Sequence, residues 1–281
     1  MHALHAALRE QDLGPVVERL REAGIEALFF KGPAVARLYP EPGLRPYGDF
    51  DVLVAPDRVE RAREAVAGAI STTVDVHGRA WVLNNVAVES VDLDVLFARS
   101  EVVRLDGLEL RTVGPEDHLR LLCLHFLAHG GWRPLWLCDV AAALEARPGG
   151  FDWDICLGGD RRLSRAVACT IALAGELLKA DLGDAPAQRP PAWMRRAVLR
   201  QWGVPASIYP GLVAGRPLKT YLRQPGGLLA ALRARWPSPL ESTLFLRVPL
   251  GGLPRFPFQL AYLLYRVGYF RWLPRERRVR A

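Results

Sequence analysis

The first seventy residues alternate between helical periodicity and short apolar runs. Apolar side chains three or four positions apart predict an amphipathic helix over residues 2–22, which Gly24 closes. The apolar run 25–30 predicts a buried strand, and the alternation of polar and apolar residues over 49–54 predicts a half-buried strand. A helical pattern returns over 56–69. Strands that alternate with helices in this way predict an α/β domain.

The pattern changes its period at Pro115, from about two residues to about 3.6. Before this point the strand signals are weak except over 86–97, where β-branched residues and strict alternation are strongest. The predicted strands of this part span 71–77, 80–85 and 86–97, and the predicted helices after it span 116–131, 135–146, 160–180, 192–202, 226–236 and 257–272.

The chain therefore divides into three parts. Residues 1–114 carry the strands, residues 115–188 are mainly helical, and residues 189–281 form a helical extension rich in Pro, Arg and Trp. The extension holds 12 of the 22 prolines, which break its helical pattern repeatedly. We predict an α/β domain, of α+β type, followed by a mainly helical C-terminal domain.

Charge is distributed very unevenly along the 281 residues. Residues 1–114 hold 13 basic and 18 acidic side chains, residues 115–188 hold 7 and 10, and residues 189–281 hold 17 and 2. The net charge of +7 thus comes entirely from the last part. Such a basic region can attract the phosphates of a nucleotide, a nucleic acid or a membrane surface, and the alternative is an ordinary solvated face.

Composition excludes several classes of protein. Hydrophobic residues make up 50% and charged residues 24%, which is unlike a disordered, collagen-like or coiled-coil chain. The four cysteines form no C-x-x-C pair, so neither a zinc ribbon nor a disulfide scaffold is indicated. We see no signal peptide and no apolar stretch of the roughly 18 residues that a transmembrane segment needs. These features predict a cytoplasmic protein.

Carboxylates are concentrated in the predicted strands. Asp49 and Asp51 stand two apart in one strand, so their side chains share a face with Cα atoms about 7 Å apart. This arrangement suits Mg²⁺, because hard divalent cations prefer carboxylate oxygens and two such ions can bridge a triphosphate. Asp92, on a separate predicted strand, can add a third carboxylate as a metal ligand or general base. The alternative for each residue is a solvated carboxylate or a helix cap.

A lysine and a glycine follow the first predicted strand. Lys31 and Gly32 precede a short predicted helix in which Pro33 takes the first position. A positive side chain, a free backbone N–H and a helix N-terminus are all suited to holding phosphate. The two observations together favour a nucleotide-binding site.

These motifs resemble an uncharacterised bacterial nucleotidyltransferase family of the nucleotidyltransferase (DNA polymerase beta-like) superfamily. The resemblance is best over residues 20–145, and a closing segment, YLLYRVGYFR, is also similar. The matching residues are Phe30-Lys31-Gly32, Tyr39-Pro40, the run from Arg45 to Val54 that contains Asp49-Phe50-Asp51, Pro115-Glu116-Asp117-His118-Leu119, His125, His129, Trp132, Leu135-Trp136-Leu137 and Asp139-Val140-Ala141.

The resemblance implies a small domain with a mixed sheet, a helical second half, two Mg²⁺ ions and transfer of a nucleoside monophosphate from an NTP to an acceptor. It implies that Lys31 and Gly32 hold the β- and γ-phosphates. It also implies that Asp49 and Asp51 bind the metal ions and that Asp92 completes the site.

Two positions depart from the family pattern. Gly32 is followed by Pro33, where the wider superfamily often has serine, so a hydroxyl and an N–H donor are missing. The third-carboxylate strand commonly reads acidic-Leu-His, whereas here Asp94 follows Asp92 and Leu93. Asp94 is therefore a further candidate for the site.

Four other residues have both a functional and a structural interpretation. His125 and His129, four apart on one helical face, can hold zinc, line a cleft or hydrogen-bond in the core. Asp139 stands in an apolar helix and needs a partner, which we expect to be Arg133, a histidine or a bound substrate. Arg45 is expected to contact the phosphate or base of the nucleotide, or to form a salt bridge with a carboxylate.

The leading hypothesis is a Mg²⁺-dependent nucleotidyltransferase that uses an NTP and an unidentified acceptor, either a small molecule, a protein or an RNA. A different hypothesis is a non-catalytic nucleotide- or RNA-binding protein on the same fold, whose residues 189–281 bind nucleic acid and whose tryptophans stack on bases. A third, which we rank lowest, is attachment to a membrane surface through residues 256–280.

Overall fold

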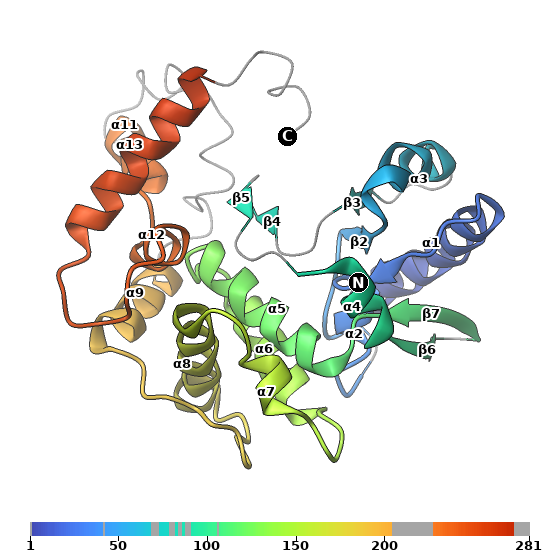
Figure 1. Ribbon diagram of the computed structural model, residues 1–281, viewed down its shortest axis with the longest axis horizontal. Coiled ribbons are helices and arrows are strands. Elements are labelled where there is room, and N and C mark those ends of the chain that lie inside the picture. Colours follow the sequence, from blue (N-terminus) through green and yellow to red (C-terminus); the bar gives the residue numbers. More distant parts are fainter. Residues whose placement is uncertain are drawn as a thin grey trace. The chain divides into compact units, whose positions relative to one another are not determined.

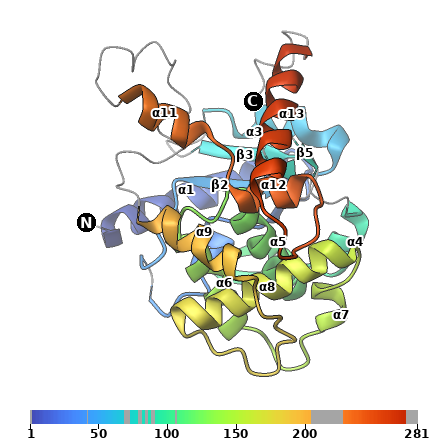
Figure 2. The ribbon, with the colours of Figure 1, turned by 90° about the vertical axis from the view of Figure 1, so that its left-hand side faces the viewer.

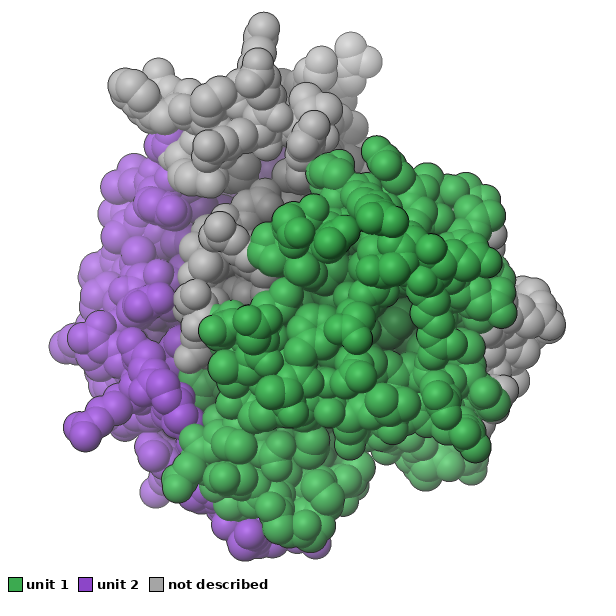
Figure 3. Space-filling view, turned by 45° about the vertical axis from the view of Figure 1, so that its right-hand side comes forward, with its two compact units in different colours: residues 1–121, 139–156 green, residues 122–138, 157–281 purple. Residues whose placement is uncertain are grey.

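The computed structural model describes residues 2–41, 43–68, 73–78, 82–83, 86–87, 91–105, 107–203 and 227–272 (Figure 1). The chain forms two compact units, coloured separately in Figure 3. The first unit comprises residues 1–121 and 139–156, and the second comprises residues 122–138 and 157–281. The division falls inside two helices, α5 (Pro115–Ala128) and α6 (Pro134–Glu145).

The first unit is built on a five-stranded mixed sheet with the strand order β3-β2-β1-β7-β6. Strand β1 runs antiparallel to β2 and parallel to β7, whereas β2 runs parallel to β3, and β6 and β7 form a hairpin. The predicted combination of a small mixed sheet and a helical part is confirmed. The strands are β1 (Leu28–Phe29), β2 (Asp49–Leu53), β3 (Thr73–His77), β6 (Glu101–Leu105) and β7 (Leu108–Thr112).

Helices α1 and α3 supply the apolar cover of this sheet. Helix α1 (His2–Glu22) runs through Pro15 without ending, and α3 (Val59–Val66) follows the 3₁₀ turn η1 (Pro56–Arg58). Because every third or fourth residue of each helix is apolar, one face of each can be buried. The buried side chains shared by the helices and strands include Leu13, Val16, Val17, Leu20, Phe29, Phe50, Val52, Ala62, Val66, Val76 and Leu110.

The strand expected over 86–97 is wrong for most of its length. Among the described residues of this range, a strand forms at β5 (Val86–Ala87) alone, and it pairs with β4 (Val82–Leu83) in a separate two-stranded sheet. Residues 88–90 lie outside the described residues. Residues 93–98 instead form the helix α4 (Leu93–Ala98). Asp92, expected on a strand of the main sheet, is therefore outside that sheet.

Asp92 begins α4 as its N-cap, with its carboxylate accepting a hydrogen bond from the Asp94 backbone N–H at 3.0 Å. Aspartate is among the best N-cap residues, and a second acidic residue in the first turn stabilises the positive helix terminus. The sequence VDLDVLF alternates like a strand, but its leucines are also three apart, and Leu96 is fully buried. The cap formed by Asp92 and the charge of Asp94 in the first turn favour the helix over the strand.

The second unit is helical, and the predicted helices of residues 116–272 are confirmed. Helix α8 is its centre, because most of its residues from Leu163 to Ala174 are buried. The Asp160 carboxylate caps this helix by accepting hydrogen bonds from two backbone N–H groups. No helix among the described residues is long and apolar enough to cross a membrane. The remaining helices are α7 (Trp153–Cys156, in the first unit), α8 (Arg161–Leu178), α9 (Ala192–Trp202), α11 (Gly227–Arg235), α12 (Pro239–Phe245) and α13 (Phe256–Trp272).

One buried histidine makes the stability of this fold depend on pH. His118 in α5 is 2% exposed, and burial together with the charge of Arg37 lowers its pKa to about 4. The imidazole hydrogen-bonds to the carbonyl of Phe30, at the end of β1. Because the unfolded chain holds the histidine at its ordinary pKa of about 6.5, the fold favours the neutral ring.

We expect the free energy of unfolding to be at its full value above pH 6.5. It should fall by about 3 kcal/mol as the pH drops from 6.5 to 4, because His118 binds a proton in the unfolded state but stays neutral in the folded state. Urea unfolding at several pH values measures this slope. The His118→Leu variant should show a flatter slope, and an unchanged slope would contradict the assignment.

Candidate functional site

The candidate site lies on β2, where polar and apolar residues alternate as the sequence predicts. Phe50 and Val52 point into the core and are fully buried. Asp49 and Asp51 share the opposite face, with Asp51 only 3% exposed and Asp49 half-buried. A buried carboxylate needs a partner, because an uncompensated charge is costly away from water.

Asp51 has two partners from neighbouring strands. The ammonium of Lys31, just after β1, lies 2.6 Å from Asp51 Oδ1, and Nε2 of His77, at the end of β3, lies 3.3 Å from the same oxygen. Burial alone would raise the pKa of the Asp51 carboxyl. The hydrogen bond with His77 and the charge of Lys31 outweigh burial and hold this pKa below its ordinary value. Asp51 is therefore ionised.

Asp49 carries negative charge that its surroundings do not fully balance. Burial raises the pKa of its carboxyl, and repulsion from Asp51 and Asp75 adds to the rise. Lys31 and Arg45 act in the opposite direction without reversing it. An added cation beside Asp49 would relieve this repulsion.

Gly32 brings the turn after β1 close to Asp49. Its φ is +59°, and a Cβ at this position would lie 2.8 Å from the backbone oxygen of Asp49. Only glycine accepts both the backbone conformation and the close approach. The helix that follows, α2 (Pro33–Ala36), is a single turn that begins with Pro33. The expected lysine–glycine turn thus lies against the strand that carries the two carboxylates.

We expect Gly32→Ala to lower the free energy of unfolding by about 1–3 kcal/mol, because the new side chain forces strain into this turn. The turn should also move away from Asp49. Gly48→Ala is the matched control, because a Cβ there meets no atom within 4 Å. Equal stability of the two variants in urea unfolding would contradict the role assigned to Gly32.

Arg45 is held beside the pair by Asp139. Nε and one terminal nitrogen of its guanidinium donate to the two Asp139 oxygens at 2.9 and 2.8 Å, and the Tyr39 hydroxyl donates to Asp139 at 2.7 Å. Burial lowers the pKa of Arg45, but the hydrogen bond and charge of Asp139 outweigh it and raise this pKa. Arg45 forms the salt bridge with a carboxylate that was one of its two interpretations, and its contact with the phosphate or base of a nucleotide stays a prediction. The partners expected for Asp139, Arg133 or a histidine, are wrong.

The other candidate residues lie on other elements. Asp92 caps α4, and Asp94 lies in the first turn of the same helix. His125 belongs to the second unit, where its ring packs against those of His129 and Trp136 with centroids 4.4 and 4.8 Å away. In the described part of the chain, no group of three or more His, Cys, Asp or Glu side chains is placed to hold a metal ion.

Sequence reasoning missed Asp75 and His77. The parallel pairing of β2 and β3 places Asp75 opposite Asp51 and His77 opposite Leu53. The signal was present, because the strand T-V-D-V-H has the same alternation as D-F-D-V-L. Only the pairing of the two strands, which the sequence does not state, shows that their carboxylates are neighbours.

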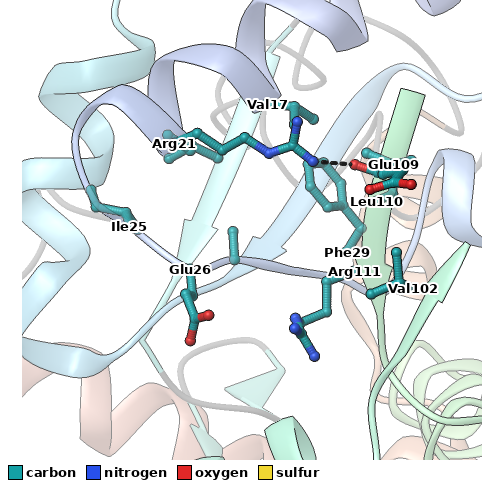
Figure 4. Close-up of a pocket in the computed structure, with 11 residues that line it drawn as sticks. Val17, Arg21, Ile25, Glu26, Phe29, Val102, Glu109, Leu110 and Arg111 are labelled. Carbon is teal, nitrogen blue, oxygen red and sulfur yellow. Dashed lines mark hydrogen bonds between the residues drawn. The ribbon is translucent and has the colours of Figure 1, made fainter. Parts of the chain in front are cut away.

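A separate pocket of about 280 Å³ lies in the first unit, near the start of β1 (Figure 4). Its apolar lining includes Val17 and Phe29, and a terminal nitrogen of Arg21 donates to the Glu109 carbonyl at 2.8 Å on one side. Lys31 follows the opposite end of β1. None of the candidate site residues lines this pocket.

A mixed sheet with a lysine–glycine turn packed on a strand that carries D-x-D is the arrangement expected of a nucleotidyltransferase. The sequence profile of a family described as uncharacterised nucleotidyltransferase matches residues 1–69 and 67–179. The chain belongs to this family. Comparisons with curated proteins and with solved structures gave no match.

The side chains present fit a divalent cation in their chemistry. Mg²⁺ is commonly held by one or two carboxylates together with the phosphates of a substrate, rather than by a complete protein cage. Asp49 and Asp51 are two such carboxylates on one strand face, and Asp49 has excess negative charge beside it. These two residues would hold the cation.

Proposed function

We propose that the protein transfers a nucleoside monophosphate from an NTP to a hydroxyl acceptor at the Asp49–Asp51 face of β2, with Mg²⁺. The observation that carries this proposal is the charge balance of the pair. Asp51 is compensated by Lys31 and His77, whereas burial, and after it repulsion from Asp51 and Asp75, raises the pKa of the Asp49 carboxyl. One further cation and a bound polyphosphate would complete the site.

In this proposal, Lys31 has one partner in the free protein and another when a triphosphate is bound. In the free protein its ammonium balances Asp51 at 2.6 Å. Its side chain is 20% exposed, so its ammonium can turn to a β- or γ-phosphate oxygen when a triphosphate binds. The Phe30 ring lies 5.4 Å from the ammonium, which helps to keep the lysine at this position.

The reaction is an in-line displacement at the α-phosphorus. The acceptor oxygen forms a bond to this phosphorus, the bond to the bridging oxygen of the β-phosphate breaks, and pyrophosphate leaves with the electron pair. The acceptor proton passes to a carboxylate of the site or to solvent. When bound, Mg²⁺ neutralises charge on the phosphoryl oxygens. Arg45, held rigidly by Asp139, keeps positive charge beside Asp49.

We further propose that Asp75, in place of Asp92, is the third carboxylate of the site, whose negative charge beside Asp49 favours a cation there without ligating it. Asp75 is in register with Asp51 on the adjacent strand and is exposed, so it is accessible to a ligand. Asp92 has its carboxylate committed to the Asp94 backbone N–H. An Asp75→Asn variant should therefore weaken Mg²⁺-dependent nucleotide binding more than Asp92→Asn does.

Calorimetry with each of the four NTPs, with and without Mg²⁺, tests the proposed function. We expect at least one NTP to bind in a Mg²⁺-dependent manner and the Asp49→Asn, Asp51→Asn double variant to lose this binding. Asp57→Asn is the control, because Asp57 is exposed in η1 and lies outside the site. Binding that needs no Mg²⁺, or that survives the double substitution, would overturn the assignment.

A further inference from the structure

Helix α13 in the second unit is apolar on both of its faces. Its inner face packs on α12, where the rings of Tyr262 and Phe245 stack with centroids 5.3 Å apart. Its outer face leaves Phe256, Leu260 and Leu264 exposed by 61%, 40% and 63%. A helix that is apolar all round is normally buried, because apolar surface in water is unfavourable. The outer face of α13 is thus suited to an apolar environment.

Helix α11 also carries exposed apolar side chains. Leu229, Leu232 and Trp236 are exposed by 63%, 48% and 37%, and their spacing of three and four residues places them on one face. The Trp236 ring stacks on Phe256 with centroids 5.7 Å apart, which joins the two helices at this point. We call these six side chains, which lie on α13, on α11 and just after α11, the apolar face. Figure 2 shows the course of the two helices.

Charge indicates what this apolar face binds. Residues 189–281 hold 17 basic and only 2 acidic side chains, and Arg233 is exposed on α11 between Leu232 and Trp236. Two copies of the chain meeting through this region would bring like charges together. An anionic lipid surface offers negative headgroups to the arginines and an apolar interior to the leucines and aromatic rings.

We propose that the apolar face is a membrane-binding surface that inserts into the headgroup region of bilayers containing anionic lipid. Tryptophan, phenylalanine and leucine beside arginine are the side chains that interfacial helices use. The helices lie on the membrane without spanning it. All residues of this surface belong to the second unit, whereas Asp49 and Asp51 belong to the first.

Co-sedimentation of the full-length protein with vesicles tests this proposal. The vesicles are phosphatidylcholine alone, or phosphatidylcholine with about one third phosphatidylglycerol. We expect binding to the anionic vesicles, at least tenfold weaker binding to the neutral ones, and a marked decrease in affinity with added salt. No binding to anionic vesicles at low salt would overturn the proposal.

Substitutions separate the apolar contribution from simple charge attraction. The Leu260→Ser, Leu264→Ser double variant should bind anionic vesicles at least tenfold more weakly, and Phe256→Ser should independently weaken binding. Val102→Ser is the matched control, because Val102 is 57% exposed on β6 in the first unit, and it should bind as the wild type does. Circular dichroism confirms that each variant is folded.

Two results would overturn the membrane assignment. Vesicle binding that is unchanged in both apolar variants would mean that charge alone holds the protein. A dimer that the same substitutions disperse, without any vesicle binding, would show that the apolar face binds a second copy of the chain.

Discussion

Asp51→Asn lowers the rate of nucleotidyl transfer by about 10²–10³-fold, which is the largest effect we expect on activity. Asparagine keeps the shape of the side chain but removes the charge that Lys31 and His77 now surround. The site then loses a cation ligand and retains an unbalanced lysine. Release of pyrophosphate, measured at saturating NTP and Mg²⁺, gives the rate.

Two comparisons make this result specific. The Asp57→Asn variant should keep the wild-type rate, because Asp57 is 73% exposed and forms an ion pair with the adjacent Arg58. Circular dichroism should show that Asp51→Asn is folded. A folded Asp51→Asn variant with more than a tenth of the wild-type rate would contradict a role for Asp51 in holding the cation.

Asp139→Ala is expected to have the largest effect on stability, lowering the free energy of unfolding by about 3–5 kcal/mol. The substitution leaves the guanidinium of Arg45 without its bidentate partner, and the Arg45 side chain is only 10% exposed. The Tyr39 hydroxyl loses its acceptor as well. Urea unfolding measures the loss, which should be accompanied by weaker nucleotide binding because Arg45 lies beside Asp49.

An exposed ion pair provides the control for this prediction. Glu60 and Arg63 in α3 are 2.8 Å apart but 65% and 49% exposed, so Glu60→Ala should change stability by less than about 1 kcal/mol. The Arg45→Leu, Asp139→Leu double variant should recover much of the loss, because it removes both buried charges. A similar effect of Asp139→Ala and Glu60→Ala would contradict the structural role of the Arg45–Asp139 pair.

Periodicity predicts most of this fold because each element buries one face. Phe50 and Val52 alternate with Asp49 and Asp51, and this pattern gives both the strand and the face that carries the carboxylates. The strand predicted over 86–97 is wrong at residues 93–98, which form a helix, because the sequence V-D-L-D-V fits both a strand and a capped helix. The capping hydrogen bond of Asp92 favours the helix.

Contacts between distant parts of the chain could not be predicted in the same way. Arg45 and Asp139 are 94 positions apart, and no local pattern states that an arginine in a loop will meet an aspartate in α6. Asp75 and His77 became visible only through the register of β3 on β2. The sequence therefore predicts the carboxylates and the lysine–glycine turn, whereas the structure is needed to show which charges balance them.

The most direct test of the account compares one NTP labelled at either the α- or the γ-phosphate. The protein is incubated with each label, Mg²⁺ and a mixture of small-molecule and RNA acceptors, beside the Asp49→Asn, Asp51→Asn variant. We predict that the α-label is transferred to an acceptor and the γ-label is released in pyrophosphate, both only with the wild type. Transfer of the γ-label, or transfer of the α-label by the double variant, would contradict nucleotidyl transfer at the Asp49–Asp51 face.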